Sequence, residues 1–249
     1  QNTFPHSSGI ASSASGMAAL AMNIMSLEKA INPMITDDYF CSKASFLARL
    51  GSGSACRSIN GEVVVWGTHA EINGSSDLFG LEFSEIHQNF KNYQDTILLV
   101  DKGEKQVSST VGHDLMHNHP YAERRFAQAH ENLFQIKAIL TSGNIEEFIK
   151  IVESEALTLH AMMMTSMPYF ILMKPNTLEI INKIWKFRNE TQIPVCFTLD
   201  AGANVHVLYP ENVKQNVLQF IQDELVGYCQ NGQYICDQIG NGSQLIMNN

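Results

Sequence analysis

The chain has 249 residues, of which 45% are hydrophobic and 16% charged, so it is long enough for one large or two small domains with a sizeable core. With 16 basic and 25 acidic residues its formal net charge is −9, which gives no general attraction for nucleic acid or anionic membranes. No apolar run reaches the roughly 20 residues of a membrane span. Five scattered cysteines without a CxxC pair are typical of a reducing cytoplasm rather than of a disulfide framework.

The first half of the chain predicts two helices and then short strands. Apolar residues recur at helical spacing over residues 14–31, and Asn32-Pro33 ends that helix. Asp37 and Asp38 are the expected cap of a second helix that runs to Arg49. Shorter elements follow as a turn of helix at residues 55–58 and as strands at 63–66, 78–83 and 96–100.

The second half predicts longer helices around a hairpin. The helices are expected at residues 120–140, 144–164, 177–188 and 211–226, and the paired strands at 195–199 and 205–209. Strands and helices are mixed rather than regularly alternating, which favours an α+β fold over a doubly wound parallel sheet. The change in character places a candidate domain boundary near residue 110.

A candidate phosphate-binding loop runs from Pro5 to Gly16 and leads into the first predicted helix. Small residues let the backbone approach a ligand, and Gly9 permits a turn that other residues resist. The helix directs its unpaired N–H groups and positive dipole end toward the loop, while Ser12 and Ser13 add hydroxyl donors or a magnesium contact. The ending of a Walker loop is absent. The pattern favours a phosphorylated ligand, above all ATP, and its alternative is a Ser-rich helix cap.

Two further segments place polar groups at glycine turns. Residues 51–58 combine two glycines, three serines and Arg57, a residue suited to bidentate capture of a carboxylate or phosphate. Asp200 ends an apolar strand just before a glycine turn, where a carboxylate can be aimed at a substrate. Each segment alone is equally consistent with a surface turn. Only the combination is specific.

Taken in order, these segments resemble the GHMP kinase superfamily and, within it, the diphosphomevalonate decarboxylases. Residues 5–14 are similar to the phosphate-loop pattern Pro-x-x-x-Gly-Leu-Ala-Ser-Ser-Ala, and residues 49–58 are similar to a run that ordinary GHMP kinases lack. Residues 108–112 resemble the diphosphate-contacting serine segment, and residues 199–202 resemble the segment with the catalytic aspartate. The resemblance extends from residue 1 to about residue 242.

The resemblance implies a GHMP kinase-like two-domain α+β fold. Residues 1–110 would form an incomplete N-terminal, ATP-binding part of the ribosomal protein S5 domain 2-like kind, and residues 111–249 a ferredoxin-like α/β C-terminal part. The implied reaction belongs to the mevalonate pathway of isoprenoid lipid biosynthesis. MgATP phosphorylates the tertiary 3-hydroxyl of mevalonate 5-diphosphate, and the 3-phosphate then leaves with CO₂ to give isopentenyl diphosphate. A cytoplasmic homodimer is also implied.

The resemblance assigns roles to individual residues. Asp200 would lie next to the 3-hydroxyl as a base or an orienting group, and Arg57 would grip the substrate carboxylate, so these two are the candidate catalytic residues. Contacts to the substrate's diphosphate and carboxylate are implied for Ser52, Gly53, Ser54, Arg57 and Ser109. Contacts to ATP are implied for Ser8, Gly9, Ala11, Ser12 and Ser13, with Ser13 also the implied magnesium contact.

The match also has departures. The chain starts at Gln1 without Met and enters a motif within a few residues. We therefore expect an N-terminal segment with a substrate-contacting Tyr and Lys to be missing, and the chain as it stands to be inactive or badly impaired. Ala203 stands where the family usually has proline, which removes no functional group.

Several alternatives stay open. The substrate could be phosphomevalonate, or the enzyme could be a mevalonate 3-kinase that does not decarboxylate, although the presence of both Arg57 and Asp200 favours decarboxylation. A different class of protein, a non-catalytic ligand-binding remnant or truncated fragment, is the remaining hypothesis. His113, His117 and His119 match no zinc-site spacing that we can justify, and we interpret them as a solvated helix entry or loop. Cys56 is expected to be a packed small residue.

Overall fold

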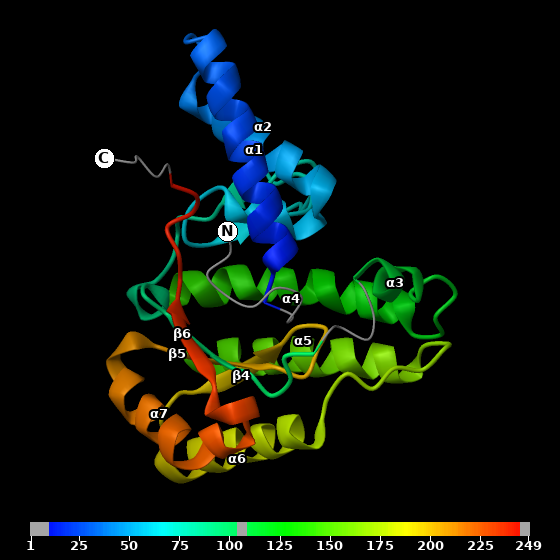
Figure 1. The fold of residues 1–249 in the computed structure, drawn as a ribbon, viewed down its shortest axis with the longest axis vertical. Helices are drawn as coiled ribbons and strands as arrows, with labels where there is room; N and C mark the ends of the chain where they lie inside the picture. The colour runs from blue at the N-terminus through cyan, green and yellow to red at the C-terminus, as the bar shows by residue number, and fades with distance from the viewer. Residues whose placement is uncertain (1–9, 104–108, 245–249) are drawn as a thin grey trace. The chain divides into compact units, whose positions relative to one another are not determined.

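The structure is a computed structural model that describes residues 10–103 and 109–244 (Figure 1). These residues form two compact units, the first with residues 11–84 and 240–244 and the second with residues 85–239. The division falls after Ser84 rather than near residue 110, because strand β3 (Gln94–Leu98) pairs with β5 (Val205–Tyr209) and β6 (Tyr234–Gln238) of the second unit.

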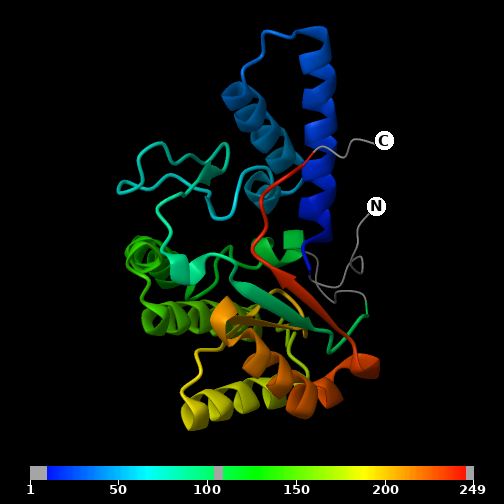
Figure 2. The same cartoon turned by 90° about the vertical axis from the view of Figure 1, so that its left-hand side faces the viewer.

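The first unit is built on two helices that lie side by side, α1 (Ser12–Ile31) and α2 (Asp37–Gly51) (Figures 1 and 2). Small side chains on one face of α1 let α2 approach closely, and the buried contact consists of Ala14, Ala18, Ala21, Met25, Phe40, Ala44 and Ala48. The cap of α2 is Thr36, whose Oγ1 accepts a hydrogen bond from the N–H of Tyr39 at 3.3 Å. Asp37 and Asp38 are not the cap but occupy the first turn, where their charge suits the helix dipole.

Helix α1 is also apolar on a second face. Leu20, Ile24, Leu27 and Ile31 recur at helical spacing and are 54%, 46%, 66% and 78% exposed. The two charged residues of α1 are paired with α2, because Glu28 accepts from Lys43 and Lys29 donates to Asp37. A helix with two hydrophobic faces is usually buried on both, and α2 covers one of them.

The remainder of the first unit is mostly loop around the 3₁₀ helix η1 (Gly53–Ser58). The predicted strands at 63–66 and 78–83 shrink to a two-residue ladder between β1 (Val64–Val65) and β2 (Leu81–Glu82). The reason is a polar connection of tight turns between them, which leaves few residues to pair.

A buried hydroxyl joins α2, η1 and the start of β2. The Oγ of Ser45, which is fully buried, donates to the carbonyl of Cys56 at 2.7 Å and accepts from the N–H of Gly80 at 2.9 Å. A Cβ at Gly80 would lie 2.7 Å from the Cys56 carbonyl oxygen, so only glycine permits this approach. Ser45 therefore fixes the backbone that carries Arg57.

The second unit contains a four-stranded antiparallel sheet in the order β4-β5-β3-β6, with β4 at Cys196–Leu199. The expected hairpin is confirmed, since Cys196 is opposite Leu208 and Leu199 is opposite Val205. Strand β6 was not predicted. It is an edge strand whose outer residues are exposed, so its sequence lacks the apolar alternation of a core strand.

Helices cover the sheet (Figure 2). They are α4 (Ala122–Ser142), α5 (Ile145–Thr165), α6 (Pro175–Thr191) and α7 (Lys214–Phe220), and a short helix, α3 (Ser109–Asp114), precedes them in the chain. Phe197, Val205 and Val207 pack with α6 and α7, whereas Leu208 packs with α4 and α5. The helices predicted at 120–140, 144–164 and 177–188 are confirmed. The last one is interrupted, because turns at 211–213, 221–225 and 226–228 flank α7.

An acid–imidazole pair crosses β3 and β5. The Nδ1 of His206 lies 2.8 Å from an Oδ2 of Asp95, and both side chains are largely buried. Burial acts against the imidazolium, but the hydrogen bond and charge of Asp95 outweigh it, so the pKa of His206 is raised.

Replacing Ser45 with Ala should destabilise the protein by about 1–3 kcal/mol, because the N–H of Gly80 and the carbonyl of Cys56 lose their partner in the core. Urea unfolding followed by circular dichroism measures this. The matched control is Ser26→Ala, because the Ser26 hydroxyl donates to the Met22 carbonyl of its own helix. Equal unfolding midpoints for the two variants would contradict the role of Ser45.

Replacing Asp95 with Asn should remove a pH-dependent part of the stability. Because the folded pKa of His206 is raised, its contribution is full below the unfolded value of about 6.5 and is lost as pH rises through the folded value. The stability difference between wild type and variant should therefore be larger at pH 6 than at pH 9 in urea titrations. A difference that does not change with pH would show that His206 stays neutral.

Candidate functional site

Two of the predicted segments converge in the first unit. The Oγ of Ser13, at the start of α1, lies 3.3 Å from the Oγ of Ser52, which precedes η1. An expected ATP and magnesium contact thus stands beside an expected substrate contact. Ala11, just before the helix, has φ 59° and ψ 32°, a left-handed conformation that is uncommon for alanine and often found at ligand sites.

The first turn of α1 carries no acidic residue, and its N-cap, Ala11, makes no side-chain hydrogen bond. An anion near this end would be favoured by the helix dipole and would meet no acidic side chain of that turn. Ser12 and Ser13 lie in this turn. Ser8 and Gly9 fall outside the described residues.

The 51–58 run presents its polar groups outward. Ala55 and Cys56 are fully buried and anchor η1, while Arg57 is exposed. No ion pair joins Arg57 to another residue within 10–103 and 109–244. Burial raises the pKa of the Cys56 thiol, so Cys56 is the packed residue that the sequence suggested rather than a nucleophile.

Gly53 lies against an aromatic side chain. A Cβ at this position would be 3.0 Å from Cη2 of Trp66, whose indole N–H donates to the carbonyl of Asp77 at 3.0 Å. Trp66 therefore lies against Gly53, which stands between Ser52 and Ser54 in the chain. Sequence reasoning gave it only as part of a strand, because nothing local shows which loop a tryptophan will cover.

Asp200 follows β4 in the second unit, and its side chain is exposed. Its Oδ1 accepts from the N–H of Ala201 at 2.9 Å, and its main-chain carbonyl accepts from the N–H of Gly202 at 2.7 Å. The same carbonyl is 3.2 Å from Nε2 of His160, a buried residue of α5. Burial lowers the pKa of His160, and the contact with Asp200 only partly offsets this, which favours a neutral imidazole.

The other end of the Asp200 turn is also held. The carbonyl of Ala203 accepts from Oγ1 of Thr177 at 2.7 Å, and Oδ1 of Asn204 accepts from the N–H of Asp101 at 3.0 Å. Thr177 and Asn204 are buried. The sequence analysis missed these anchors and His160, because they belong to distant elements and no local motif marks them.

The other candidates are only partly described. Ser109 is the first residue of α3, and its side chain lies outside the described part. His119 was expected to be solvated, but it is buried, because its Nε2 lies 3.1 Å from the carbonyl of Met162. Among the residues that the structure describes, no group of His, Cys, Asp and Glu side chains is arranged to hold a metal ion.

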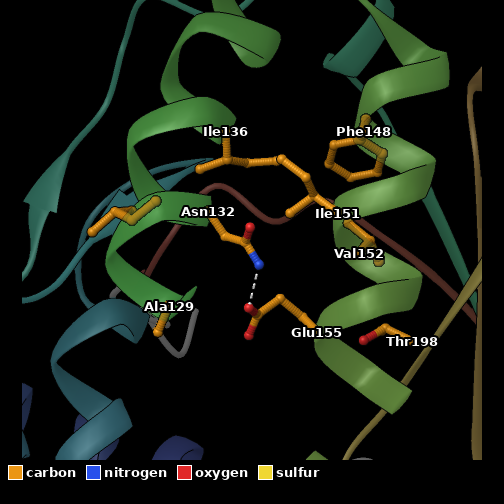
Figure 3. A pocket seen from close by; sticks show the side chains of 9 residues that line it. Ala129, Asn132, Ile136, Phe148, Ile151, Val152, Glu155 and Thr198 are labelled. Atoms are coloured by element: carbon orange, nitrogen blue, oxygen red, sulfur yellow. Dashed lines mark hydrogen bonds between the residues drawn. The ribbon is translucent and has the colours of Figure 1, made fainter. Parts of the chain in front are cut away.

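Helices α4 and α5 border a separate groove of about 320 Å³ in the second unit (Figure 3). Its lining is mostly apolar. At one end Nδ2 of Asn132 donates to Glu155 at 2.6 Å, and Arg125 also pairs with Glu155. None of the predicted site residues lines this groove, although Thr198, two residues before Asp200, does.

Two family models of known proteins match this chain, one in each half. The family model of the diphosphomevalonate decarboxylase-like N-terminal domain matches residues 1–78, and that of the mevalonate 5-diphosphate decarboxylase C-terminal domain matches residues 96–244. None of the helices in the described part of the chain is long and apolar enough to cross a membrane.

Individual relatives agree. The diphosphomevalonate decarboxylase of Eremothecium gossypii is 30% identical over 214 residues, which are 84% of this chain but only 51% of that protein. The phosphomevalonate decarboxylase of Haloferax volcanii is 26% identical over 90% of this chain and 64% of its own length. The chain thus spans about half to two thirds of the curated relatives that it matches.

A solved structure described as MDDEF in complex with MVAPP, AMPPCP and magnesium superimposes with a TM-score of 0.79 at 29% identity, over 97% of this chain and 69% of that one. This similarity confirms the expected α+β fold of the GHMP kinases. Because the C-terminal family model alone matches more than half of the residues, the chain belongs to the mevalonate 5-diphosphate decarboxylase family.

Proposed function

We propose that the protein carrying this chain converts mevalonate 5-diphosphate to isopentenyl diphosphate by ATP-dependent decarboxylation. The observation that carries the proposal is the presence of two complementary groups. An exposed guanidinium, Arg57, stands in the run that resembles the decarboxylases and not other GHMP kinases, and an exposed carboxylate, Asp200, ends β4. The Arg57 guanidinium can bind the substrate carboxylate that leaves as CO₂. The Asp200 carboxylate can accept a hydrogen bond from the substrate hydroxyl that is phosphorylated.

The first chemical step is phosphorylation of the 3-hydroxyl. Phosphoryl transfer through a loose transition state depends mainly on positioning and charge, so Asp200 acts by orienting the hydroxyl and receiving its proton. Ala11, Ser12 and Ser13, at the start of α1, would hold the ATP phosphates, and Ser13 would contact magnesium. ATP supplies the phosphoryl group that turns the hydroxyl into a good leaving group.

The second step breaks two bonds together. The C–O bond to the 3-phosphate breaks, and the electron pair of the bond between the carboxylate carbon and C2 becomes the new C2–C3 double bond, with release of CO₂ and phosphate. Arg57 orients the carboxylate for this loss. The hydroxyls of Ser52 and Ser54 and the backbone of Gly53 bind the substrate's anionic groups, and Ser109 adds a further hydroxyl by resemblance.

Related substrates define the main alternative. The similarity to the Haloferax relative favours phosphomevalonate as a second candidate, because that protein shares the same matched region. A mevalonate 3-kinase would need Asp200 but not Arg57. We also propose a cytoplasmic homodimer. The cysteines form no disulfide, which supports a reducing compartment, and the dimer rests on the family resemblance.

The decisive assay measures CO₂ and ADP from the protein as encoded, with mevalonate, its 5-phosphate and its 5-diphosphate in turn. Mevalonate 5-diphosphate should give CO₂ and ADP in equal amounts. Formation of ADP without CO₂ would show that the protein is a kinase and not a decarboxylase. Faster turnover of the 5-phosphate than of the 5-diphosphate would show that phosphomevalonate is the substrate. Ligand binding without turnover would support a non-catalytic protein.

Replacing Asp200 with Asn should lower kcat by at least about 100-fold, because Asn keeps the shape of the side chain but cannot accept the hydroxyl proton. Binding of ATP should be unchanged, as measured by fluorescence of a nucleotide analogue. The control is Asp223→Asn, because Asp223 is an exposed residue of the turn at 221–225 that follows α7. Normal turnover by the Asp200 variant would exclude it from the reaction.

Replacing Arg57 with Gln should reduce kcat/KM roughly 10- to 100-fold, the effect of losing a hydrogen bond to a charged group. The ratio of CO₂ to ADP should also fall, because the carboxylate is no longer aligned while phosphorylation persists. Arg124→Gln, which removes a guanidinium from the exposed surface of α4, should behave as wild type. An unchanged CO₂-to-ADP ratio together with unchanged kcat/KM would contradict the role of Arg57.

A further inference from the structure

The direction of the Asp200 carboxylate depends on a short turn that is open at its middle. Asp200 is exposed, and a Cβ added at Gly202 would meet no atom within 4 Å, whereas Ala203 is buried. At Gly202 itself no packed side chain sets the shape of the turn, so hydrogen bonds to the main chain contribute to it there.

One of these bonds comes from a buried histidine that the proposed reaction does not use. His160 on α5 is 1% exposed, and its Nε2 lies 3.2 Å from the carbonyl oxygen of Asp200. Because a carbonyl can only accept, Nε2 must carry the proton and donate. Burial lowers the pKa of His160, which favours the neutral imidazole with its proton on Nε2 and adds no charge beside the carboxylate.

The histidine is held on a rigid element. Helix α5 is capped by Asn144, whose side chain accepts from the N–H of Glu147, and it packs along β4. Ala156, one turn before His160, is buried in the same core as β4. At the far end of the turn Thr177 donates to the carbonyl of Ala203. The turn is therefore fixed at both ends by neutral donors.

We propose that His160 is a positioning residue that sets the angle at which the Asp200 carboxylate meets the substrate hydroxyl. The inference rests on the proposed function of Asp200. His160 acts through the main chain, because its bond fixes the peptide that follows Asp200 and so the rotation of the residue about its own backbone. It has no contact with substrate in this role.

The test compares His160→Leu with His160→Gln in the wild-type protein and in Asp200→Asn. Leu removes the donor, whereas the amide of Gln can donate from a similar place. His160→Leu should lower kcat about 10- to 100-fold and keep the KM values within about twofold of wild type. His160→Gln should retain most of the wild-type kcat. In Asp200→Asn the Leu replacement should cause no further loss, because the group that it positions is already gone.

A control variant separates a loss of protein stability from a loss of positioning. Ile149→Ala removes a buried side chain from the same helix without touching the turn, so it should destabilise the protein while kcat stays near wild type. If His160→Leu keeps its kcat, or loses it equally in both backgrounds, or follows stability as Ile149→Ala does, the positioning role is overturned.

A second readout does not need turnover. Hydrogen exchange of the Ala201 and Gly202 amides should accelerate at least about tenfold in His160→Leu and stay near wild type in His160→Gln, since the loss of one hydrogen bond of about 1.4 kcal/mol corresponds to tenfold. Unchanged exchange would overturn the inference. If the wild-type protein releases no CO₂, the proposed function fails, and the exchange result still decides whether His160 orders this turn.

Discussion

An acidic chain can hold a strongly anionic ligand only where donors are concentrated and carboxylates are kept away. The first unit meets this constraint at one place. The first turn of α1 has no acidic residue, the hydroxyls of Ser13 and Ser52 lie side by side, and Arg57 is an exposed cation in the same unit. Small side chains make this possible, because bulky ones would keep a ligand from the backbone N–H groups.

Both parts of the candidate site depend on the same device, a buried neutral side chain that donates to a main-chain carbonyl. Ser45 does this beneath the Arg57 run, and His160 and Thr177 do it beneath the Asp200 turn. A neutral donor in the core costs little once it is paired. A buried charge would need a partner of its own and would alter the field at the site. The functional groups can therefore be exposed while their backbone is fixed from inside.

Local sequence patterns predicted the helices well, because α1, α2, α4, α5 and α6 each carry apolar residues at a spacing that only a helix places on one face. The hairpin of β4 and β5 was equally visible. Edge strand β6 was not, because its exposed residues carry no alternation, and the boundary after Ser84 depends on pairing between strands far apart in the chain.

Some residues of the candidate site could be predicted from the sequence, and others could not. The segments around Ser13, Arg57 and Asp200 stand out because glycines, serines and a charged residue gather in a few positions. Ser45, His160 and Thr177 could not be found, since a serine, a histidine or a threonine within a helix looks the same whether it points into a loop or into solvent. Trp66 was hidden for the same reason, because only the folded chain shows that it covers Gly53.

The exposed stripe of Leu20, Ile24, Leu27 and Ile31 has a consequence at the bench. A continuous row of aliphatic side chains adsorbs fluorescent dyes, detergents and plastic surfaces as readily as it contacts other polypeptides. Preparations of this chain alone would give a high signal in dye-based melting curves before any unfolding occurs. Ligand binding followed by such a probe would then report adhesion along α1 as well as occupancy of the site.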